Sequence, residues 1–179
     1  MISLKECVVS DASPIISLER IPKGHLYLSK LFSKVYVPEK AMFEITRKPP
    51  RTFEDYKDFY NISEIIEVVN CKIDRTISDI DTLFDFKKDN DYEGEAYALS
   101  FAIQNGFRVL LDDKKPITIA KKNGIKFYNL GTYTLRAYKK SILSIFEAEE
   151  MLENFKNANI YSEADYLLYR QILLNIDSK

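Results

Sequence analysis

Short apolar runs alternate with helical patterns along the chain, and this alternation restricts the possible folds more than any other feature. The apolar runs lie at residues 7–9, 34–37, 65–69, 107–111 and 125–128, and helical spacing marks most of the stretches around them. Strands separated by helices of about 10–15 residues are typical of a parallel sheet that helices cover on both faces. We therefore expect an α/β fold with a mostly parallel central sheet and further helices in the C-terminal region.

The length and composition indicate one globular domain. The chain has 179 residues, of which 46% are hydrophobic and 30% charged, so it can bury a substantial core and is short for two domains. Neither an internal repeat nor a linker divides it. We expect a single domain over residues 1–179, with a core at about 5–143 and a C-terminal helical tail at about 144–179.

Charge and cysteine content exclude several functional classes. The 26 basic residues balance 27 acidic ones, so contact with nucleic acid requires a local basic patch. Cys7, Cys71 and the single histidine, His25, are too few ligands for a disulfide framework or a zinc site. No apolar run approaches the ~18 residues of a membrane span, and the N-terminal residues lack the apolar region of a signal peptide. These features predict a cytoplasmic protein with no membrane partner.

Local signals place some helix boundaries. Ser13 followed by Pro14 predicts an N-cap with proline at the first helical position, opening a helix over 15–20. Gly106 closes a clear helical pattern over 93–105, and residues 78–86 also show helical spacing. The polar residues 48–63 carry no clear signal of either secondary structure.

Acidic residues follow two of the expected strands directly. Asp11 comes after the first strand, and Asp112 and Asp113 come after the strand at 107–111. Functional groups of parallel sheets gather at the carboxyl ends of strands, although an aspartate such as Asp113 also serves as an ordinary helix cap. Glu95 shares a helical stripe with Leu99, and the helix dipole alone does not explain a glutamate on that apolar stripe.

Glu44 completes a possible acidic pocket. Alone, it reads as a surface glutamate that pairs with Lys40 or Lys48 at helical spacing. Together with Asp11, Glu95 and Asp112, however, it stands near the end or first turn of successive elements. Carboxylates that share a pocket repel one another, and a hard cation such as Mg²⁺ or Mn²⁺ relieves that repulsion. Such an ion supports phosphodiester hydrolysis.

At these residues the sequence resembles the PIN-domain nucleases, and within them the single-domain VapC-type toxins of prokaryotes. The motifs stand in matching order at compatible spacing. They are Val8-Val9-Ser10-Asp11-Ala12-Ser13-Pro14, Val37-Pro38-Glu39 running to Glu44, Gly94-Glu95-Ala96, Leu110-Leu111-Asp112-Asp113 and Lys121-Lys122-Asn123-Gly124-Ile125-Lys126. The likeness extends through the C-terminal helices and covers nearly the whole chain.

The resemblance implies a three-layer α/β/α fold and an Mg²⁺- or Mn²⁺-dependent endoribonuclease, acting as the toxin of a toxin–antitoxin pair. It assigns the four acidic catalytic positions to Asp11, Glu44, Glu95 and Asp112. The expected metal ligands are Asp11, Glu95, Asp112 and Asp113. Ser13 is expected to support the first aspartate. Relatives usually have a Gly-Thr step after the last strand, where this chain has Asn129-Leu130, and Thr132 is expected to compensate.

Further features bear on substrate and partners. Lys114, Lys115, Arg47 and Lys48 follow acidic motifs and are expected to hold RNA phosphates, although each also reads as an ordinary surface residue. A broad apolar stripe at 167–176 has three alternative interpretations. It packs on its own domain, it forms a homodimer, or it binds a small antitoxin protein. The alternative functions are a catalytically inactive PIN-like module that binds RNA or protein, and a phosphatase of the haloacid dehalogenase type. The latter requires Asp-x-Asp after the first strand, where the chain has Asp11-Ala12-Ser13.

Overall fold

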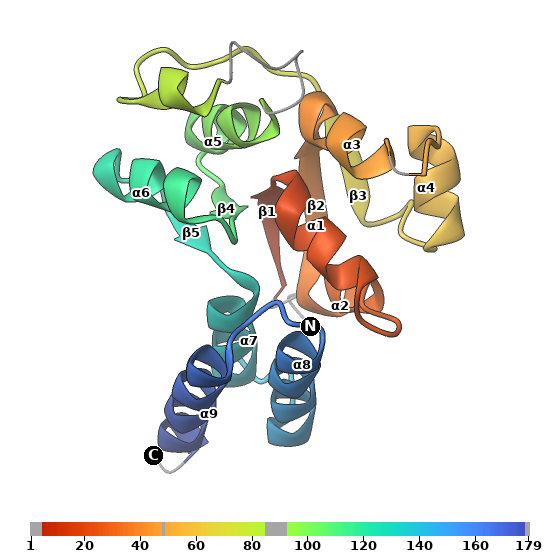
Figure 1. Cartoon of the computed structure of the whole chain (residues 1–179), viewed down its shortest axis with the longest axis vertical. Coiled ribbons are helices and arrows are strands. Elements are labelled where there is room, and N and C mark those ends of the chain that lie inside the picture. The colour runs from red at the N-terminus through yellow and green to blue at the C-terminus, as the bar shows by residue number, and fades with distance from the viewer. Residues whose placement is uncertain (1–4, 48, 85–92, 178–179) are drawn as a thin grey trace.

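A five-stranded parallel sheet forms the centre of the protein (Figure 1). The computed structural model describes residues 5–47, 49–84 and 93–177. The strands are β1 (Glu6–Ser10), β2 (Phe32–Pro38), β3 (Ile66–Val69), β4 (Arg108–Leu110) and β5 (Phe127–Tyr128), in the spatial order β3-β2-β1-β4-β5. Every neighbouring pair is parallel, which confirms the predicted sheet.

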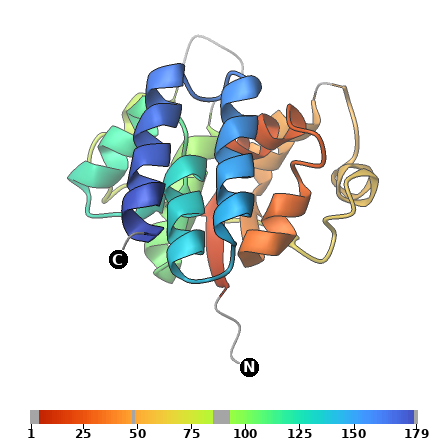
Figure 2. The same ribbon diagram turned by 90° about the horizontal axis from the view of Figure 1, so that it is seen from below.

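Helices connect the strands and extend the chain beyond them. The α-helices are α1 (Ala12–Glu19), α2 (Leu26–Leu31), α3 (Glu39–Thr46), α4 (Phe53–Phe59), α5 (Gly94–Asn105), α6 (Lys114–Lys122), α7 (Leu130–Lys139), α8 (Ile145–Asn157) and α9 (Glu163–Asp177), and η1 (Ile80–Leu83) is a 3₁₀-helix. Helices α7, α8 and α9 pack against one another, as Figure 2 shows from below. Within the described residues, none of these helices has both the length and the apolar character that crossing a membrane requires.

The sheet separates two hydrophobic cores because successive strand residues point to opposite faces. Val8 and Leu110 belong to one core, with buried residues of α1, α2, α3, α7, α8 and α9. Val9, Val109 and Leu111 belong to the other, with residues of η1, α5 and α6. Helices therefore cover both faces, and the expected three-layer α/β/α architecture is confirmed.

The strand order creates a switch point at the middle of the sheet. From β1 the chain builds β2 and β3 on one side, and later it returns to add β4 and β5 on the other. Ser10 of β1 is in register with Leu110 of β4, so the residues that follow both strands emerge at the same edge. Ligands of open α/β sheets bind at such a point, outside the carboxyl ends of the strands.

The predicted start of the first helix is wrong by two residues. Helix α1 begins at Ala12, with Asp11 rather than Ser13 in the N-cap position. Pro14 is therefore the third helical residue, which is compatible with proline because the first N–H groups of a helix have no partner within it. The shift frees the Ser13 hydroxyl to donate to Oδ1 of Asp11.

Two other segments differ from the sequence expectation. The helical spacing over 78–86 yields only the short helix η1, which follows Asp79 with a positive φ of 64°; residues 85 and 86 lie outside the described residues. The unassigned residues 48–63 contain α4, whose N-cap Thr52 accepts a hydrogen bond from the Asp55 N–H. Gly106 ends α5 with a φ of 69°, in agreement with the predicted helix end.

Candidate metal centre

Three carboxylates meet at the switch point of the sheet. Asp11 follows β1, Asp113 follows β4, and Glu95 lies in the first turn of α5. One carboxylate oxygen of each lies within 4.8 Å of those of the other two. We call these three residues the acidic cluster. Asp11 is buried, Glu95 is half-buried and Asp113 is exposed, so the cluster reaches solvent on the Asp113 side.

Helix starts surround the acidic cluster. Asp11 and Asp113 occupy the N-cap positions of α1 and α6, yet neither side chain makes a capping hydrogen bond. Their carboxylates therefore remain available to the cluster, which answers the suggestion that Asp113 is only a helix cap. The positive end of a helix dipole favours a carboxylate, and α1, α5 and α6 all begin here.

Asp11 is the most deeply buried member. Its side chain is 1% exposed, Oδ1 accepts a hydrogen bond of 3.3 Å from the Ser13 hydroxyl, and buried Oδ2 receives none from the described residues. Burial raises the pKa of Asp11 well above its usual value, and the negative charges of Glu95, Asp112, Asp113 and Glu44 raise it further. The Ser13 hydroxyl therefore contacts Asp11 directly.

Glu95 is perturbed in the same direction. Burial is the largest cause that raises its pKa to about 7, and repulsion from Asp113 and Glu44 adds to it. The Lys115 ammonium opposes this rise, so it lies close enough to act on Glu95. A cluster whose carboxylates resist ionisation is suited to a cation that supplies the missing positive charge.

Glu44 acts on the cluster from α3 through the start of α5. Its Oε1 accepts a hydrogen bond of 2.9 Å from the backbone N–H of Gly94, the residue before Glu95. A Cβ at position 94 would lie 2.6 Å from that oxygen and 2.9 Å from Cα of Ala41. The absence of a side chain at Gly94 therefore allows α3 and α5 to approach. Glu44 caps α5 while its charge remains close to Glu95 and Asp11.

Asp112 occupies a different environment from the three cluster residues. Its Oδ1 accepts hydrogen bonds from the Leu130 N–H at 3.4 Å and the Tyr161 hydroxyl at 3.2 Å, whereas Oδ2 is buried and receives none from the described residues. Burial raises the pKa of Asp112 to about 6, against the lowering effect of the two hydrogen bonds. The structure thus brings Asp113, rather than Asp112, into the group of closest oxygens.

The remaining predicted residues lie around this centre. Thr132 forms a capping box with Asn129 at the start of α7, whose Leu130 N–H is the donor to Asp112. Thr132 therefore acts on the backbone beside Asp112. This arrangement places the unusual Asn129-Leu130 step at the N-terminus of a helix.

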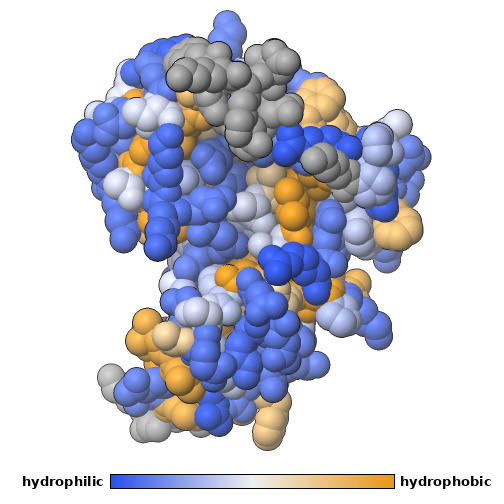
Figure 3. All heavy atoms as spheres, viewed as in Figure 1, coloured by the Kyte–Doolittle hydropathy of each residue, from blue (hydrophilic) through white to orange (hydrophobic). Residues whose placement is uncertain are grey.

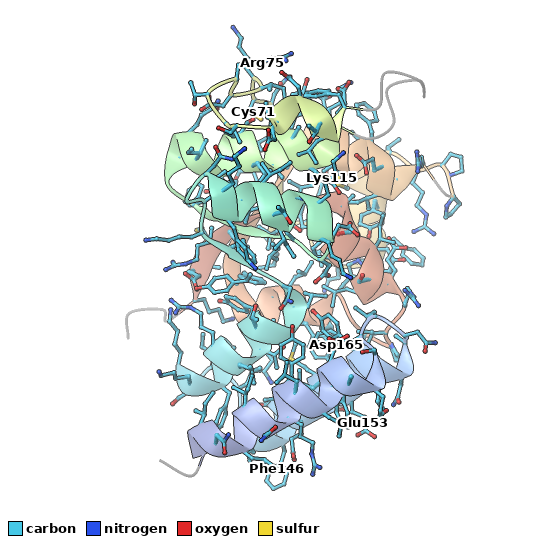
Figure 4. All side chains as sticks on the ribbon, turned by 60° about the vertical axis from the view of Figure 1, so that its left-hand side comes forward. Cys71, Arg75, Lys115, Phe146, Glu153 and Asp165 are labelled. Atoms are coloured by element: carbon cyan, nitrogen blue, oxygen red, sulfur yellow. The ribbon has the colours of Figure 1, made fainter. Side chains whose placement is uncertain are left out.

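The expected phosphate-binding residues are dispersed. Lys115 is the second residue of α6, where its charge acts on Glu95, and it donates to the Thr82 carbonyl. The charge of Lys114 instead acts on Asp165 in the first turn of α9. Figure 4 shows Lys115 and Asp165 on the same side of the molecule. Arg47 ends α3 and forms an isolated bridge with Pro50, and Lys48 lies outside the described residues.

The donor set fits a hard divalent cation. All the converging atoms are carboxylate oxygens, which Mg²⁺ and Mn²⁺ prefer over the nitrogen and sulfur ligands typical of zinc. Buried polar atoms in proteins normally have a partner, yet Oδ2 of Asp11 and Oδ2 of Asp112 have none among the described residues. A cation bound by the acidic cluster would offset the repulsion among its carboxylates.

The fold and the acidic cluster define an α/β protein with a carboxylate site suited to a divalent cation. The model of a family described as DUF3368, a PIN domain, matches residues 7–178. The protein therefore belongs to the PIN-domain family, whose members are generally nucleases. A comparison with curated proteins found no match.

Sequence reasoning missed two contributors to this site, Gly94 and Tyr161. Gly94 stood in one of the motifs without a role of its own, although glycine is the residue that permits close approach of the backbone to a neighbouring group. Asp113 was expected among the metal ligands, although the sequence did not separate its role from that of Asp112. Tyr161 carried no local signal, because its contact with Asp112 joins residues 49 positions apart.

Proposed function

We propose that the protein is an endoribonuclease that depends on Mg²⁺ or Mn²⁺ and hydrolyses RNA phosphodiester bonds. The observation that carries the proposal is the convergence of Asp11, Glu95 and Asp113 within 4.8 Å at the switch point of the sheet. In this proposal those three residues hold the cation, and Asp112 contributes its buried Oδ2. Glu44 completes the acidic site by holding the first turn of α5.

Each side chain has a separate part in the proposed reaction. A bound divalent cation would lower the pKa of a water molecule and neutralise phosphate charge. Ser13 orients Asp11, and Glu44 sets the position of Glu95 through Gly94. The exposed side of the cluster, at Asp113, admits the substrate, and the Lys115 ammonium beside Glu95 supplies positive charge for a phosphate.

The choice of RNA and the biological role are proposed from the motifs. The resemblance to VapC-type toxins supports RNA as the substrate and a toxin role in the cytoplasm, with a small antitoxin protein as the partner. Helix α9 offers a surface for this partner or for a second copy of the chain. Leu167 and Leu168 of this helix are 53% and 54% exposed. Figure 3 shows apolar atoms at the surface in the lower left of the view, where α9 lies in Figure 1.

The proposed activity is tested by incubating the purified full chain with total RNA in Mn²⁺, and in parallel with EDTA. Cleavage that requires the metal and is lost in Asp11→Asn supports the proposal. The competing function is an inactive PIN-like module. It predicts RNA binding without cleavage and no Mn²⁺ binding at millimolar concentration by calorimetry, and that result would overturn the enzyme assignment.

A further inference from the structure

The C-terminal helices reach the metal centre through one side chain. Tyr161 lies in the connection between α8 and α9, and its hydroxyl is 3.2 Å from Oδ1 of Asp112. The same hydroxyl is 2.9 Å from the backbone nitrogen of Gly131, in the first turn of α7. A residue outside the sheet and its crossover helices thus joins Asp112 to α7.

The two contacts determine the direction of the Tyr161 proton. A backbone N–H can only donate, so the phenol oxygen accepts from Gly131. The phenol has one proton, and the Asp112 carboxylate is the partner that can accept it. Tyr161 is therefore a donor to Oδ1 of Asp112, in a hydrogen bond strengthened by the charge of the acceptor.

Packing fixes the Tyr161 ring as well as its hydroxyl. The ring contacts Phe155 of α8 edge-on, with centroids 5.7 Å apart, and lies 5.3 Å from the Tyr169 ring of α9. The Tyr169 ring itself closes against α7, since a Cβ on Gly131 would lie 2.6 Å from it. Contacts with the three helices α7, α8 and α9 thus fix the position of the Tyr161 side chain and its hydroxyl.

This arrangement leaves the two oxygens of Asp112 unequal. Oδ1 receives both donors, from Leu130 and Tyr161, whereas Oδ2 is buried with no partner among the described residues. Two donors on one oxygen restrict rotation of the carboxylate. The orientation they select leaves the other oxygen to the cation proposed above.

We infer that Tyr161 is a positioning residue of the metal centre, which orients the Asp112 carboxylate for the cation and makes the α8–α9 connection part of the active site. The inference rests on the proposed function, because it assumes that the centre binds a divalent cation. Residues that hold ligating carboxylates in this way typically contribute about 10–100-fold to metal affinity or activity.

The test compares Tyr161→Phe with the matched variant Tyr169→Phe by Mn²⁺ calorimetry on the RNA-free protein. Tyr169 packs beside Tyr161, but its hydroxyl contacts Asn129, at 2.8 Å, instead of a carboxylate. We expect Tyr161→Phe to weaken Mn²⁺ binding about 10–100-fold. The Mn²⁺ affinity of the Tyr169→Phe variant should stay within about twofold of the wild-type value, even where its Tm falls, because the hydrogen bonds to Asp112 remain intact.

A double-mutant cycle separates positioning from general damage to the fold. In an Asp112→Asn background the Tyr161→Phe substitution should change Mn²⁺ affinity by less than about twofold, because the oriented charge is already lost. Wild-type affinity in Tyr161→Phe, or equal weakening in both tyrosine variants, overturns the inference and leaves the nuclease proposal standing. A wild-type chain that binds no Mn²⁺ overturns both.

The contact is also testable without a substitution. In the wild-type chain labelled with ¹³Cζ-tyrosine, Mg²⁺ should shift the Tyr161 resonance through its hydrogen bond to Asp112. An unchanged Tyr161 resonance at saturating Mg²⁺ contradicts the inference. Because this measurement uses the wild-type chain, it remains decisive even if Tyr161→Phe does not fold.

Discussion

Glu44 on α3 accepts a hydrogen bond from the backbone N–H of Gly94 on α5, 50 residues along the chain. Through this bond one predicted acidic residue determines where another is placed, because Gly94 directly precedes Glu95. Neither partner is replaceable without cost, since the glycine leaves room for the carboxylate and the carboxylate caps the helix. The acidic site is therefore assembled by helix packing as well as by the sheet.

The Gly94→Ala substitution tests this close approach. The new Cβ would lie 2.6 Å from Oε1 of Glu44 and 2.9 Å from Cα of Ala41, so α3 and α5 must separate. We expect a loss of about 1–3 kcal/mol in the free energy of unfolding, measured with urea, and a strong loss of cleavage. Gly106→Ala is the control, because its Cβ meets nothing within 4 Å although its φ is +69°. It should lose about 1 kcal/mol and keep activity.

The Asp11→Asn substitution should separate function from stability. It removes one of several mutually repelling charges, so without metal the Tm should equal or exceed that of the wild type while RNA cleavage is abolished. For Asp165→Asn we expect the opposite pair of results, lower stability with activity retained. Ser162 holds the pKa of Asp165 below its usual value by hydrogen bonds, so this variant should lower the Tm and retain cleavage. A clear loss of stability in Asp11→Asn with activity retained would refute the assignment of Asp11.

Stability without metal should fall as the pH rises. The pKa of Glu95 is raised to about 7 and that of Asp112 to about 6, so the folded state binds more protons than the unfolded state between pH 4 and 7. Because these extra protons leave the folded state as the pH rises, the free energy of unfolding should decrease over this range, as measured by urea titrations with EDTA. Glu95→Gln should flatten the profile. A profile that rises from pH 5 to 8 in the wild type contradicts the raised pKa values.

Added Mn²⁺ should remove that trend, because the cation and the protons compete for the same carboxylates. Mn²⁺ affinity measured by calorimetry is expected to increase between pH 5.5 and 7.5, through the pKa values of about 6 and 7. The Tm at a saturating excess of Mn²⁺ should then be nearly independent of pH over the same interval, because tighter metal binding offsets the loss of stability of the metal-free protein. An affinity that does not depend on pH would show that the ion binds away from these carboxylates.

The Lys115→Met substitution tests the proposed phosphate contact. Lys115 acts on Glu95 from the start of α6, so its loss should raise the KM for RNA and reduce the salt dependence of binding by about one charge. Lys122→Met is the matched control in the last turn of the same helix, where Lys122 pairs with Asp79 at 2.7 Å. Equal effects of the two substitutions on KM would assign the change to net charge rather than to a contact at the site.

The position of Asp112 shows where sequence reasoning stopped. Leu110 faces the core shared with α7, α8 and α9, and Leu111 faces the opposite core. The next residue of the alternation, Asp112, turns back toward the first side, where Leu130 and Tyr161 donate to it. The pattern places two aspartates after this strand, but only the packed helices show which of them joins Asp11 and Glu95.

The sequence by itself was sufficient for the order of the strands and of most helices, the two covered faces of the sheet and the arrival of Asp11 and Asp112-Asp113 at one edge. These features follow from local periodicity and from the geometry of parallel strands, which short stretches of sequence encode. Only the tertiary structure decided that Asp113 completes the acidic cluster, that Gly94 admits Glu44, and that Tyr161 holds Asp112. Each of these depends on the packing distance between elements far apart in the chain, which no local pattern contains.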